Sequence, residues 1–239
     1  MTYRQDSDIV HSYGRYVPRN RSDTIHDRQS VDFYLSPINN RSTFDIQQEF
    51  TSRQNRILWI VSNCNARSKR YQIAQQLSQH FPVDQYGQCS RSNRNSKRLS
   101  AQDFERMLFR YKFYLAFENA HCQDYITEKA FYNALAHGSI PIVLGASENN
   151  YRQILPSDSF IHIDHFTGIK QLVGELERVS KHLDVFRIYH RWRTDYRLIS
   201  WPSNYFIDDR FCDLCMRLQE NHNERKSYSN FSEWLNRCE

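Results

Sequence analysis

The chain has 239 residues and a formal net charge of +5, with 39% hydrophobic, 25% charged and 14% aromatic residues. This length is enough for one packed domain or slightly more. No apolar run of 18 or more residues occurs and no charged-then-apolar leader opens the chain, so neither a membrane span nor a signal peptide is expected. The densest basic stretch, residues 91–98, accompanies no nucleic-acid-binding motif, so we expect a solvated loop there and no nucleic-acid partner.

Short apolar runs alternate with helix-like segments along most of the chain. After a polar stretch over residues 21–52, a connecting loop or short helix, apolar runs typical of buried strands occupy residues 57–61, 83–86, 113–117, 140–144 and 160–163. Apolar residues at helical spacing predict helices over residues 67–80, 103–111, 126–137, 148–155, 167–183, 184–198 and 207–219. Gly138 is well suited to end the helix over 126–137. The alternation predicts an α/β fold, a Rossmann-like parallel sheet with helices on both faces.

Polar residues follow two of the predicted strands directly. Ser62 and Asn63 come after the first strand, and Glu118 and Asn119 after the third. Ligands of such sheets bind at the carboxyl ends of strands, near the point where the strand order reverses. These four residues are therefore expected to form walls of a site.

Residues 113–145 suit a nucleotide diphosphate. They read as strand, polar turn, helix and strand, an order that places backbone N–H groups and a positive helix end beside the strand's carboxyl edge. Lys129, in the first turn of that helix, can add a point charge for a phosphate, and Glu128 can accept hydrogen bonds from sugar hydroxyls. Arg70, in the helix after the first strand, carries a fork that fits phosphate oxygens.

Each of these residues also has a purely structural interpretation. Lys129 and Glu128 are equally typical of a solvated first helical turn, and Arg70 of a basic surface cluster. Asn119 could cap the following turn, and Tyr125 could simply pack.

The six cysteines favour structural disulfides, with the pairing left open. One CxxC pair, Cys212 and Cys215, is not a zinc site without a second pair or histidines at ligand spacing, and it lies too late for a thioredoxin-like redox site. No metal site is expected. Three Asn-x-Ser triplets, at Asn20, Asn40 and Asn230, support a secretory setting.

Several ordered motifs resemble one enzyme family. The run FENAHCQDYITEK, residues 117–129, resembles the signature of the α1,3/4-fucosyltransferases, glycosyltransferase family 10, which transfer fucose from GDP-fucose to N-acetylglucosamine. TYRQDSDIVHSYG, WIVSNCNARSKRYQIAQQL, VDQYGQC, SIPIVLG and PSDSFIHIDHF resemble further family blocks, in the right order. The resemblance covers roughly residues 2–215, and its several motifs make it specific.

The resemblance implies roles for individual residues around GDP-fucose, the expected donor substrate. Arg70 and Lys129 align with the phosphate-contacting cations, Glu128 with the ribose-binding residue, and Asn119 and Tyr125 with donor-pocket residues. Looser matches are Tyr114, Ser62 and Asn63, together with Tyr3 and Arg4 in a segment near the donor. No metal or other cofactor is expected, because two cations balance the diphosphate and the only Asp-x-Asp spacing, at Asp6 and Asp8, lies far from the turn in sequence.

The resemblance also implies a larger architecture. This chain would be the C-terminal half of a GT-B glycosyltransferase: an interdomain remnant over residues 1–52, a GDP-fucose-binding domain over 53–220 and a polar tail over 221–239. The family's catalytic base is a Glu of an acceptor-binding domain that precedes this region, so no residue here is assigned that role. The late CxxC of the family forms disulfides with cysteines of that domain.

The implied function is inverting α1,3-transfer of fucose to N-acetylglucosamine of glycoprotein or glycolipid glycans. The implied location is the lumenal side of the Golgi cisterna membrane, through an anchor that this sequence does not show. The alternative is a truncated, inactive module that binds a GDP-sugar but lacks the acceptor domain.

Overall fold

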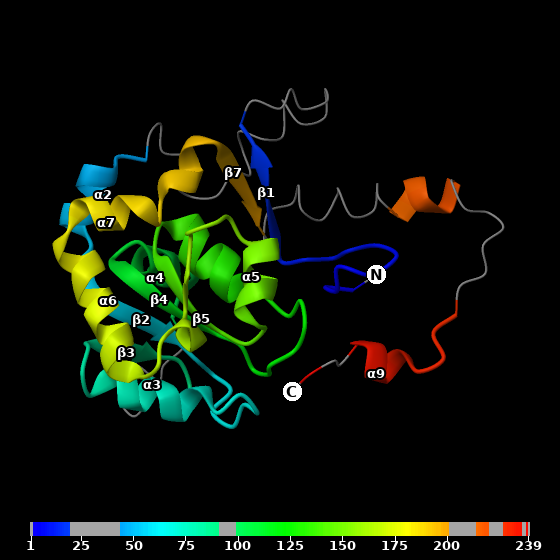
Figure 1. The fold of residues 1–239 in the computed structure, drawn as a ribbon, viewed down its shortest axis with the longest axis horizontal. Coiled ribbons are helices and arrows are strands. Elements are labelled where there is room, and N and C mark those ends of the chain that lie inside the picture. Colours follow the sequence, from blue (N-terminus) through cyan, green and yellow to red (C-terminus); the bar gives the residue numbers. More distant parts are fainter. Residues whose placement is uncertain are drawn as a thin grey trace.

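The predicted parallel sheet is confirmed. The structure is a computed structural model that describes residues 2–19, 44–90, 99–200, 214–219, 227–235 and 238. Its main sheet has five strands in the order β3-β2-β4-β5-β6, and every neighbouring pair is parallel (Figure 1). The strands are β2 (Gln54–Ile60), β3 (Val83–Tyr86), β4 (Tyr111–Phe117), β5 (Ile140–Leu144) and β6 (Ile161–His162).

The central strands are apolar on both sides because both faces of the sheet are covered. All seven residues of β4 are buried, as expected for a strand inside a parallel sheet. Alternate side chains point to opposite faces, so Phe113 and Leu115 join one core cluster and Tyr114 and Ala116 the other.

Helices α3 (Arg70–Ser78), α6 (Ile169–Lys181) and α7 (Leu183–Ile188) supply the first of these clusters. Leu77, Leu172 and Leu176 are fully buried there, and each such side chain contributes roughly 1.5–3 kcal/mol. Helix α2 (Ile46–Ser52) begins at Asp45, whose carboxylate accepts two backbone N–H groups, and it packs Phe50 against Phe186 of α7 with ring centroids 5.6 Å apart.

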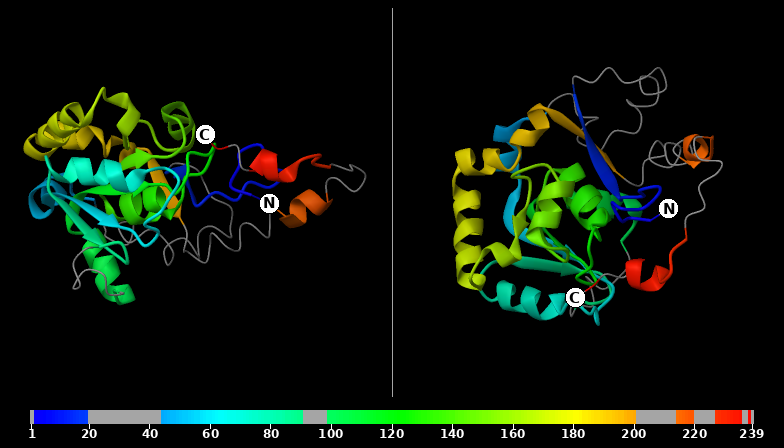
Figure 2. Two further views of the ribbon diagram at one scale, coloured as in Figure 1. Left: turned by 90° about the horizontal axis from the view of Figure 1, so that it is seen from below. Right: turned by 45° about the vertical axis from the view of Figure 1, so that its right-hand side comes forward.

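The opposite face is covered by α4 (Ala101–Leu108), the helical segment after the polar turn and α5 (Glu148–Ile154). Ser100 and Ser147 cap α4 and α5 through their side-chain oxygens, which satisfies N–H groups that the helices leave unpaired. Helices on both faces are thus confirmed (Figure 2).

The α-helix predicted over residues 126–137 is wrong in type and start. The segment forms a π-helix, η1 (Lys129–Ala134), followed by a 3-10 helix, η2 (Leu135–His137), which ends at Gly138 with φ +80° as predicted. The N–H groups of Ile126 and Thr127 bond to the Asp124 carbonyl and the Glu118 carboxylate, and a helix-like turn then forms as the Ala130 N–H donates to the Thr127 carbonyl.

The helix predicted over residues 184–198 is also wrong in its second half. After α7, residues Arg191–Thr194 form a 3-10 helix, η4, and Tyr196–Ser200 form strand β7. Strand β7 pairs antiparallel with β1 (Gly14–Pro18) in a separate two-stranded sheet. The partner strand lies some 180 residues earlier in the sequence, so no local pattern could indicate it.

The remaining differences are shifts of element ends. The helix predicted over 103–111 corresponds to α4, which starts two residues earlier. The helix predicted over 167–183 corresponds to α6, which is two residues shorter at each end. The last predicted strand keeps only Ile161 and His162 before a 3-10 helix, η3 (Ile163–His165). In the helix predicted over 207–219, residues 214–219 are helical, and the preceding seven lie outside the described residues.

Two disulfides confirm the structural reading of the cysteines. Cys64–Cys89 joins the segments that follow β2 and β3, and Cys122–Cys238 joins the polar turn after β4 to the end of the chain. Cys215 is an exposed free thiol. Cys212, the basic stretch 91–98 and the triplets at Asn20 and Asn40 lie outside the described residues.

The two ends of the chain lie side by side at one flank of the domain (Figures 1 and 2). The Tyr3 hydroxyl donates to the Leu235 carbonyl at 2.9 Å, the Tyr228 hydroxyl donates to Asp8 at 2.7 Å, and the Arg4 guanidinium lies 5.2 Å from the centre of the Trp234 ring. Helix α9 (Phe231–Leu235) carries Trp234. Among the helices that the structure describes, none has the length and apolarity that a membrane span requires.

Candidate functional site

The strand order reverses between β2 and β4. From β2 the chain moves to β3 at one edge, and from β4 it moves through β5 to β6 at the other edge. Such a switch point leaves a crevice at the carboxyl ends of the two strands. Ser62 and Asn63, both exposed, follow β2 there, and Glu118 and Asn119 follow β4.

The Arg70 guanidinium bridges the two strand ends. It donates from Nη1 to the Phe117 carbonyl at 2.7 Å and from Nη2 to the Asn63 carbonyl at 2.9 Å. Lys69 precedes it with φ +53°, the left-handed turn that starts α3. The interpretation of Arg70 as part of a surface cluster is therefore wrong, since the residue is 4% exposed.

Burial lowers the pKa of Arg70 more than the charges of Glu118 and Glu128 raise it, and within the described part of the chain no carboxylate forms an ion pair with Arg70. Its Nε is buried and has no hydrogen-bond partner among the described residues. Burying a charge without a counter-ion costs free energy. An anion at this edge of the sheet would offset that cost.

Two further side chains hold the loop before α3 against the end of β4. The Ser68 hydroxyl donates to the Glu118 carbonyl at 2.7 Å, and the Ser68 N–H to the Asn119 carbonyl at 3.1 Å. The His121 ring contacts the carbonyls of Ser68 and Gly145 at 3.3 and 3.1 Å. The position of Arg70 is thus set by a network rather than by α3 alone.

Lys129 lies on the other side of the same strand end. Its Nζ donates to Glu118 at 2.8 Å, to the Thr127 hydroxyl at 2.7 Å and to Glu128 at 3.4 Å. Burial alone would lower the pKa of Lys129, but the carboxylates of Glu118 and Glu128 outweigh it and raise the pKa. The interpretation as a solvated surface turn is wrong, because all three donors of the ammonium have protein acceptors.

Glu118 occupies the start of the helical segment. Its buried carboxylate accepts from the Thr127 N–H at 2.8 Å and from the Thr127 hydroxyl at 2.9 Å, as well as from Lys129. Burial raises the pKa of Glu118. We expected the backbone N–H groups at this helix end to face a ligand. The N–H of Thr127 instead donates to Glu118.

The polar turn itself is held from two directions. Asp124 adopts φ +62°, and its backbone N–H and carboxylate bond the Asn150 side chain at 2.7 and 2.6 Å. Its other carboxylate oxygen accepts the Gln5 N–H at 3.0 Å. Asparagine and aspartate tolerate this left-handed conformation better than most residues.

Tyr125 and Asn119 lie in this turn, half-buried. The Tyr125 ring is 5.2 Å from the ring of Tyr3, and burial raises the pKa of both hydroxyls. Arg4 makes a bidentate ion pair with Asp6 at 2.8 and 2.7 Å. The structure therefore brings the expected Tyr3 and Arg4 segment to the turn.

Tyr114 is placed differently from the other expected residues. Its ring is 1% exposed within the second core cluster, and its hydroxyl accepts a hydrogen bond from Asn133 at 2.9 Å. Glu128, in contrast, is partly exposed beside Lys129. The ligand-binding roles of all these residues stay predictions.

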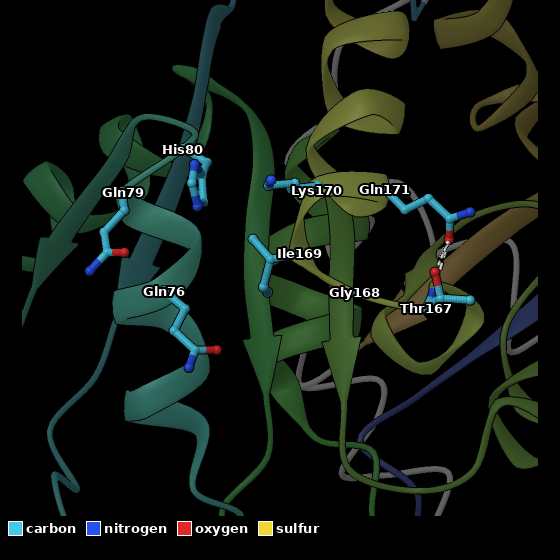
Figure 3. A pocket seen from close by; sticks show the side chains of 8 residues that line it. All are labelled: Gln76, Gln79, His80, Thr167, Gly168, Ile169, Lys170 and Gln171. Atoms are coloured by element: carbon cyan, nitrogen blue, oxygen red, sulfur yellow. Dashed lines mark hydrogen bonds between the residues drawn. The ribbon is translucent and has the colours of Figure 1, made fainter.

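A separate cavity of about 470 Å³ opens between α3 and the start of α6 (Figure 3). It is lined by Gln76, Gln79, His80, Thr167, Gly168, Ile169, Lys170 and Gln171. None of the expected site residues lines it. Arg70 begins α3 at its far end, about 9 Å along the helix axis from Gln76, the nearest lining residue of that helix.

Sequence reasoning gave no role to Ser68, Thr127 or, beyond a place in the site wall, Glu118. The one available signal was a carboxylate directly after the apolar run 113–117, followed nine residues later by Thr127 and eleven residues later by Lys129. Within the described ranges no group of three or more His, Cys, Asp and Glu side chains is arranged to hold a metal ion.

Residues 50–234 match the family described as glycosyltransferase family 10 (fucosyltransferase), C-terminal part. The chain belongs to this family. Alpha-(1,3)-fucosyltransferase 4 of Bos taurus is 33% identical over 235 residues, which is 98% of this chain and 53% of that protein. Glycoprotein 3-alpha-L-fucosyltransferase A of Drosophila melanogaster is also 33% identical, over 98% of this chain and 42% of that protein. The chain thus spans about half the length of the curated relatives it matches.

Solved structures share the fold of this family member. A crystal structure of alpha1,3-fucosyltransferase with GDP-fucose matches with a TM-score of 0.56 at 17% identity, over 84% of this chain and 56% of that one. One with GDP matches with a TM-score of 0.54 at 16% identity, over 82% and 54%. The resemblance to the fucosyltransferase family and its α/β architecture are confirmed.

Proposed function

We propose that this chain is the GDP-fucose-binding part of an α1,3-fucosyltransferase that transfers fucose to N-acetylglucosamine of glycoprotein or glycolipid glycans. The observation that carries the proposal is Arg70. A buried guanidinium bridges the carboxyl ends of the two strands at the switch point, with no carboxylate paired to it in the described structure. Lys129 adds a second cation beside the same strand end.

In the proposed reaction, the acceptor hydroxyl attacks the anomeric carbon from the face opposite the diphosphate. The bond from that carbon to the diphosphate oxygen breaks, its electron pair stays on GDP, and the hydroxyl proton passes to a base not assigned here. Negative charge develops on the leaving diphosphate, where Arg70 and Lys129 would stabilise it. No metal or other cofactor is proposed for this step.

The contacts of Lys129 indicate how it would engage the ligand. Its three donors are in use, but the 3.4 Å contact to Glu128 is the longest. A phosphate oxygen would replace Glu128 there first. Glu128 would then be released to accept hydrogen bonds from the ribose hydroxyls, the role that the family motif implies.

The other predicted donor-site residues surround the same edge. Asn119 and Tyr125 line the polar turn, and Ser62 and Asn63 the end of β2. Tyr114 is buried in the core, so it would support the site indirectly, by packing β4 against η1. Tyr3 and Arg4 would act through their contacts with the turn.

A secretory setting fits this activity. The two disulfides support an oxidising compartment, and we propose the lumenal side of the Golgi. We also propose the domain limits predicted from the sequence, with the GDP-fucose-binding domain over residues 53–220. Association with the membrane would use an anchor outside this chain.

Titration calorimetry with GDP and GDP-fucose tests the proposal. The chain is expected to bind both, and Arg70→Gln is expected to weaken GDP binding by about 1.5–3 kcal/mol, the worth of hydrogen bonds to a charged group. Arg178→Gln is the control, since it removes an exposed arginine paired with Glu175 on α6. Wild-type affinity in a folded Arg70→Gln variant, or no GDP binding by the wild type, would contradict the proposal.

A transfer assay separates the two functional readings. Fucose transfer to N-acetylglucosamine acceptors would support the enzyme. GDP-fucose binding without transfer would support the alternative, a GDP-sugar-binding module.

A further inference from the structure

Glu118 is the residue whose position the proposed reaction leaves unexplained. Its side chain has no solvent exposure, so it cannot touch a donor sugar or phosphate from where it lies. Yet both of its oxygens are engaged, by the Thr127 N–H, the Thr127 hydroxyl and the Lys129 ammonium, at 2.8 to 3.0 Å.

The stem of the Glu118 side chain packs closely against Gly145, the residue that follows β5. A Cβ on Gly145 would lie 2.9 Å from the Glu118 Cβ, so only a glycine leaves room there. The same point is 3.4 Å from the Tyr151 hydroxyl, which is buried without a hydrogen-bond partner among the described residues. The Glu118 side chain thus lies between the end of β5 and the helical segment, with its carboxylate bonded to Thr127 and Lys129.

The Lys129 ammonium needs a fixed carboxylate to hold its position, whereas the Arg70 guanidinium does not. The Arg70 guanidinium is planar and is fixed by two backbone carbonyls. A lysine ammonium sits on a flexible four-carbon stem whose ordering costs about 2 kcal/mol of rotamer entropy. A fixed carboxylate 2.8 Å away orders that stem before any ligand arrives.

We infer that Glu118 is a positioning residue, whose negative charge holds the Lys129 ammonium in place for the diphosphate of the donor. This inference rests on the proposed function. Glu118 acts through Lys129 and Thr127 and touches no reacting atom.

The pH dependence of GDP binding should report this role. The titratable and charged groups that face Lys129 are Glu118, Glu128, Tyr13, Tyr114 and Tyr125. Of the two carboxylates, Glu118 is the nearer and the more buried. Losing its charge lowers the pKa of Lys129, so the ammonium is lost at lower pH and GDP affinity falls earlier as the pH rises.

The test is a set of GDP titrations of the full chain between pH 7 and 10. Glu118→Gln is expected to weaken GDP binding about tenfold or more and to bring into this pH range an alkaline fall in affinity that the wild type does not show there. Glu118→Asp keeps the charge, so it is expected to move that fall back out of this range. Glu177→Gln, which removes the exposed carboxylate paired with Lys181 at 2.9 Å, should change neither quantity.

A double variant tests whether Glu118 acts through Lys129. In a Lys129→Met background, adding Glu118→Gln should cost no further GDP affinity. Wild-type affinity and pH profile in Glu118→Gln, or a full tenfold loss in the Lys129→Met background, would overturn the inference while leaving the proposed function intact. Absence of GDP binding by the wild type would overturn both.

If Glu118→Gln alone fails to fold, the inference is tested by comparing the thermal unfolding of Lys129→Met with that of the double variant. Lys129→Met leaves the buried Glu118 carboxylate bonded to Thr127 but without its cation, which is destabilising, whereas removing both charged partners is less so. The double variant should therefore unfold at a higher temperature than Lys129→Met. A lower temperature would assign Glu118 a purely structural role and overturn the inference.

Discussion

At the scale of single residues, Lys112 of β4 places an ammonium group inside the fold. Its side chain is 2% exposed, its Nζ donates to the Ser180 carbonyl at 3.2 Å, and the Phe50 ring centre is 3.7 Å away. Burial lowers the pKa of Lys112 to about 8. The folded chain therefore bears the cost of a buried ammonium at neutral pH.

The sign of the pH dependence follows from this shift. Between pH 8 and 10.5, the unfolded chain still binds a proton at Lys112 that the folded chain has released, so stability rises with pH across that window. Lys112→Met should raise the free energy of unfolding at pH 7 by about 1–3 kcal/mol and abolish this rise. Urea unfolding at pH 7, 8, 9 and 10 measures both effects; a less stable variant with an unchanged pH dependence would contradict the explanation.

Arg53 is the opposite case, a buried charge with a full set of partners. Its guanidinium pairs with Glu49 at 2.6 Å and donates to the carbonyls of Tyr111 and His137 at 3.1 and 2.6 Å. Arg53→Met leaves a buried carboxylate without this guanidinium, so it should cost about 3–5 kcal/mol in urea unfolding. Lys181→Met breaks an exposed pair with Glu177 and should change the free energy of unfolding by less than about 1 kcal/mol.

Residue types and strand ends made Arg70 and Lys129 predictable as neighbours of the same edge. Arg70 begins the helix after β2, and Lys129 begins the helix after β4. Because β2 and β4 flank the switch point, the topology places the backbone of both residues near the same edge of the sheet. The role of Glu118 was not predictable, because it depends on where Thr127 and Gly145 lie in space. The engagement of all three Lys129 donors depends on the same three-dimensional contacts.

At the scale of elements, Gly87 ends β3 under a steric constraint. It has φ +92°, and a Cβ there would lie 2.5 Å from the Val61 carbonyl oxygen. Gly87→Ala should therefore lower the free energy of unfolding by about 1–3 kcal/mol. Gly174→Ala in α6 meets open space and should raise it by about 0.5–1 kcal/mol; equal effects of the two substitutions would contradict the argument.

The elements that the sequence predicts well are those that bury apolar runs within the parallel sheet. Strands β2, β3, β4 and β5 fall within a few residues of the expected ranges, because the apolar runs within β2, β4 and β5 are buried in the parallel sheet. Strands β1 and β7 were missed, since their pairing joins Gly14 to Ser200. The π-helical turn was missed because the apolar residues of this segment keep the spacing of an ordinary helix.

At the scale of the whole molecule, the Cys122–Cys238 bond closes the longer of the two disulfide loops. The sequence separations are 116 and 25 residues, and loop-closure entropy alone would assign the longer one about 4–5 kcal/mol and the shorter about 3–4 kcal/mol. Those values apply only where both joined segments unfold together with the core. The contacts of the C-terminal segment point to a different behaviour.

Helix α9 of the C-terminal segment contains no buried residue, and its Phe231 remains 49% exposed. A segment with little buried apolar surface opens locally, at a lower cost than global unfolding. Cys238→Ser should therefore speed amide hydrogen exchange in residues 2–10 and 227–235 at least about tenfold, while exchange in β4 stays unchanged. The double variant Cys64→Ser, Cys89→Ser should instead lower the urea midpoint of the whole domain. If Cys238→Ser accelerated exchange in β4 equally, the two chain ends would belong to the same cooperative unit as the sheet.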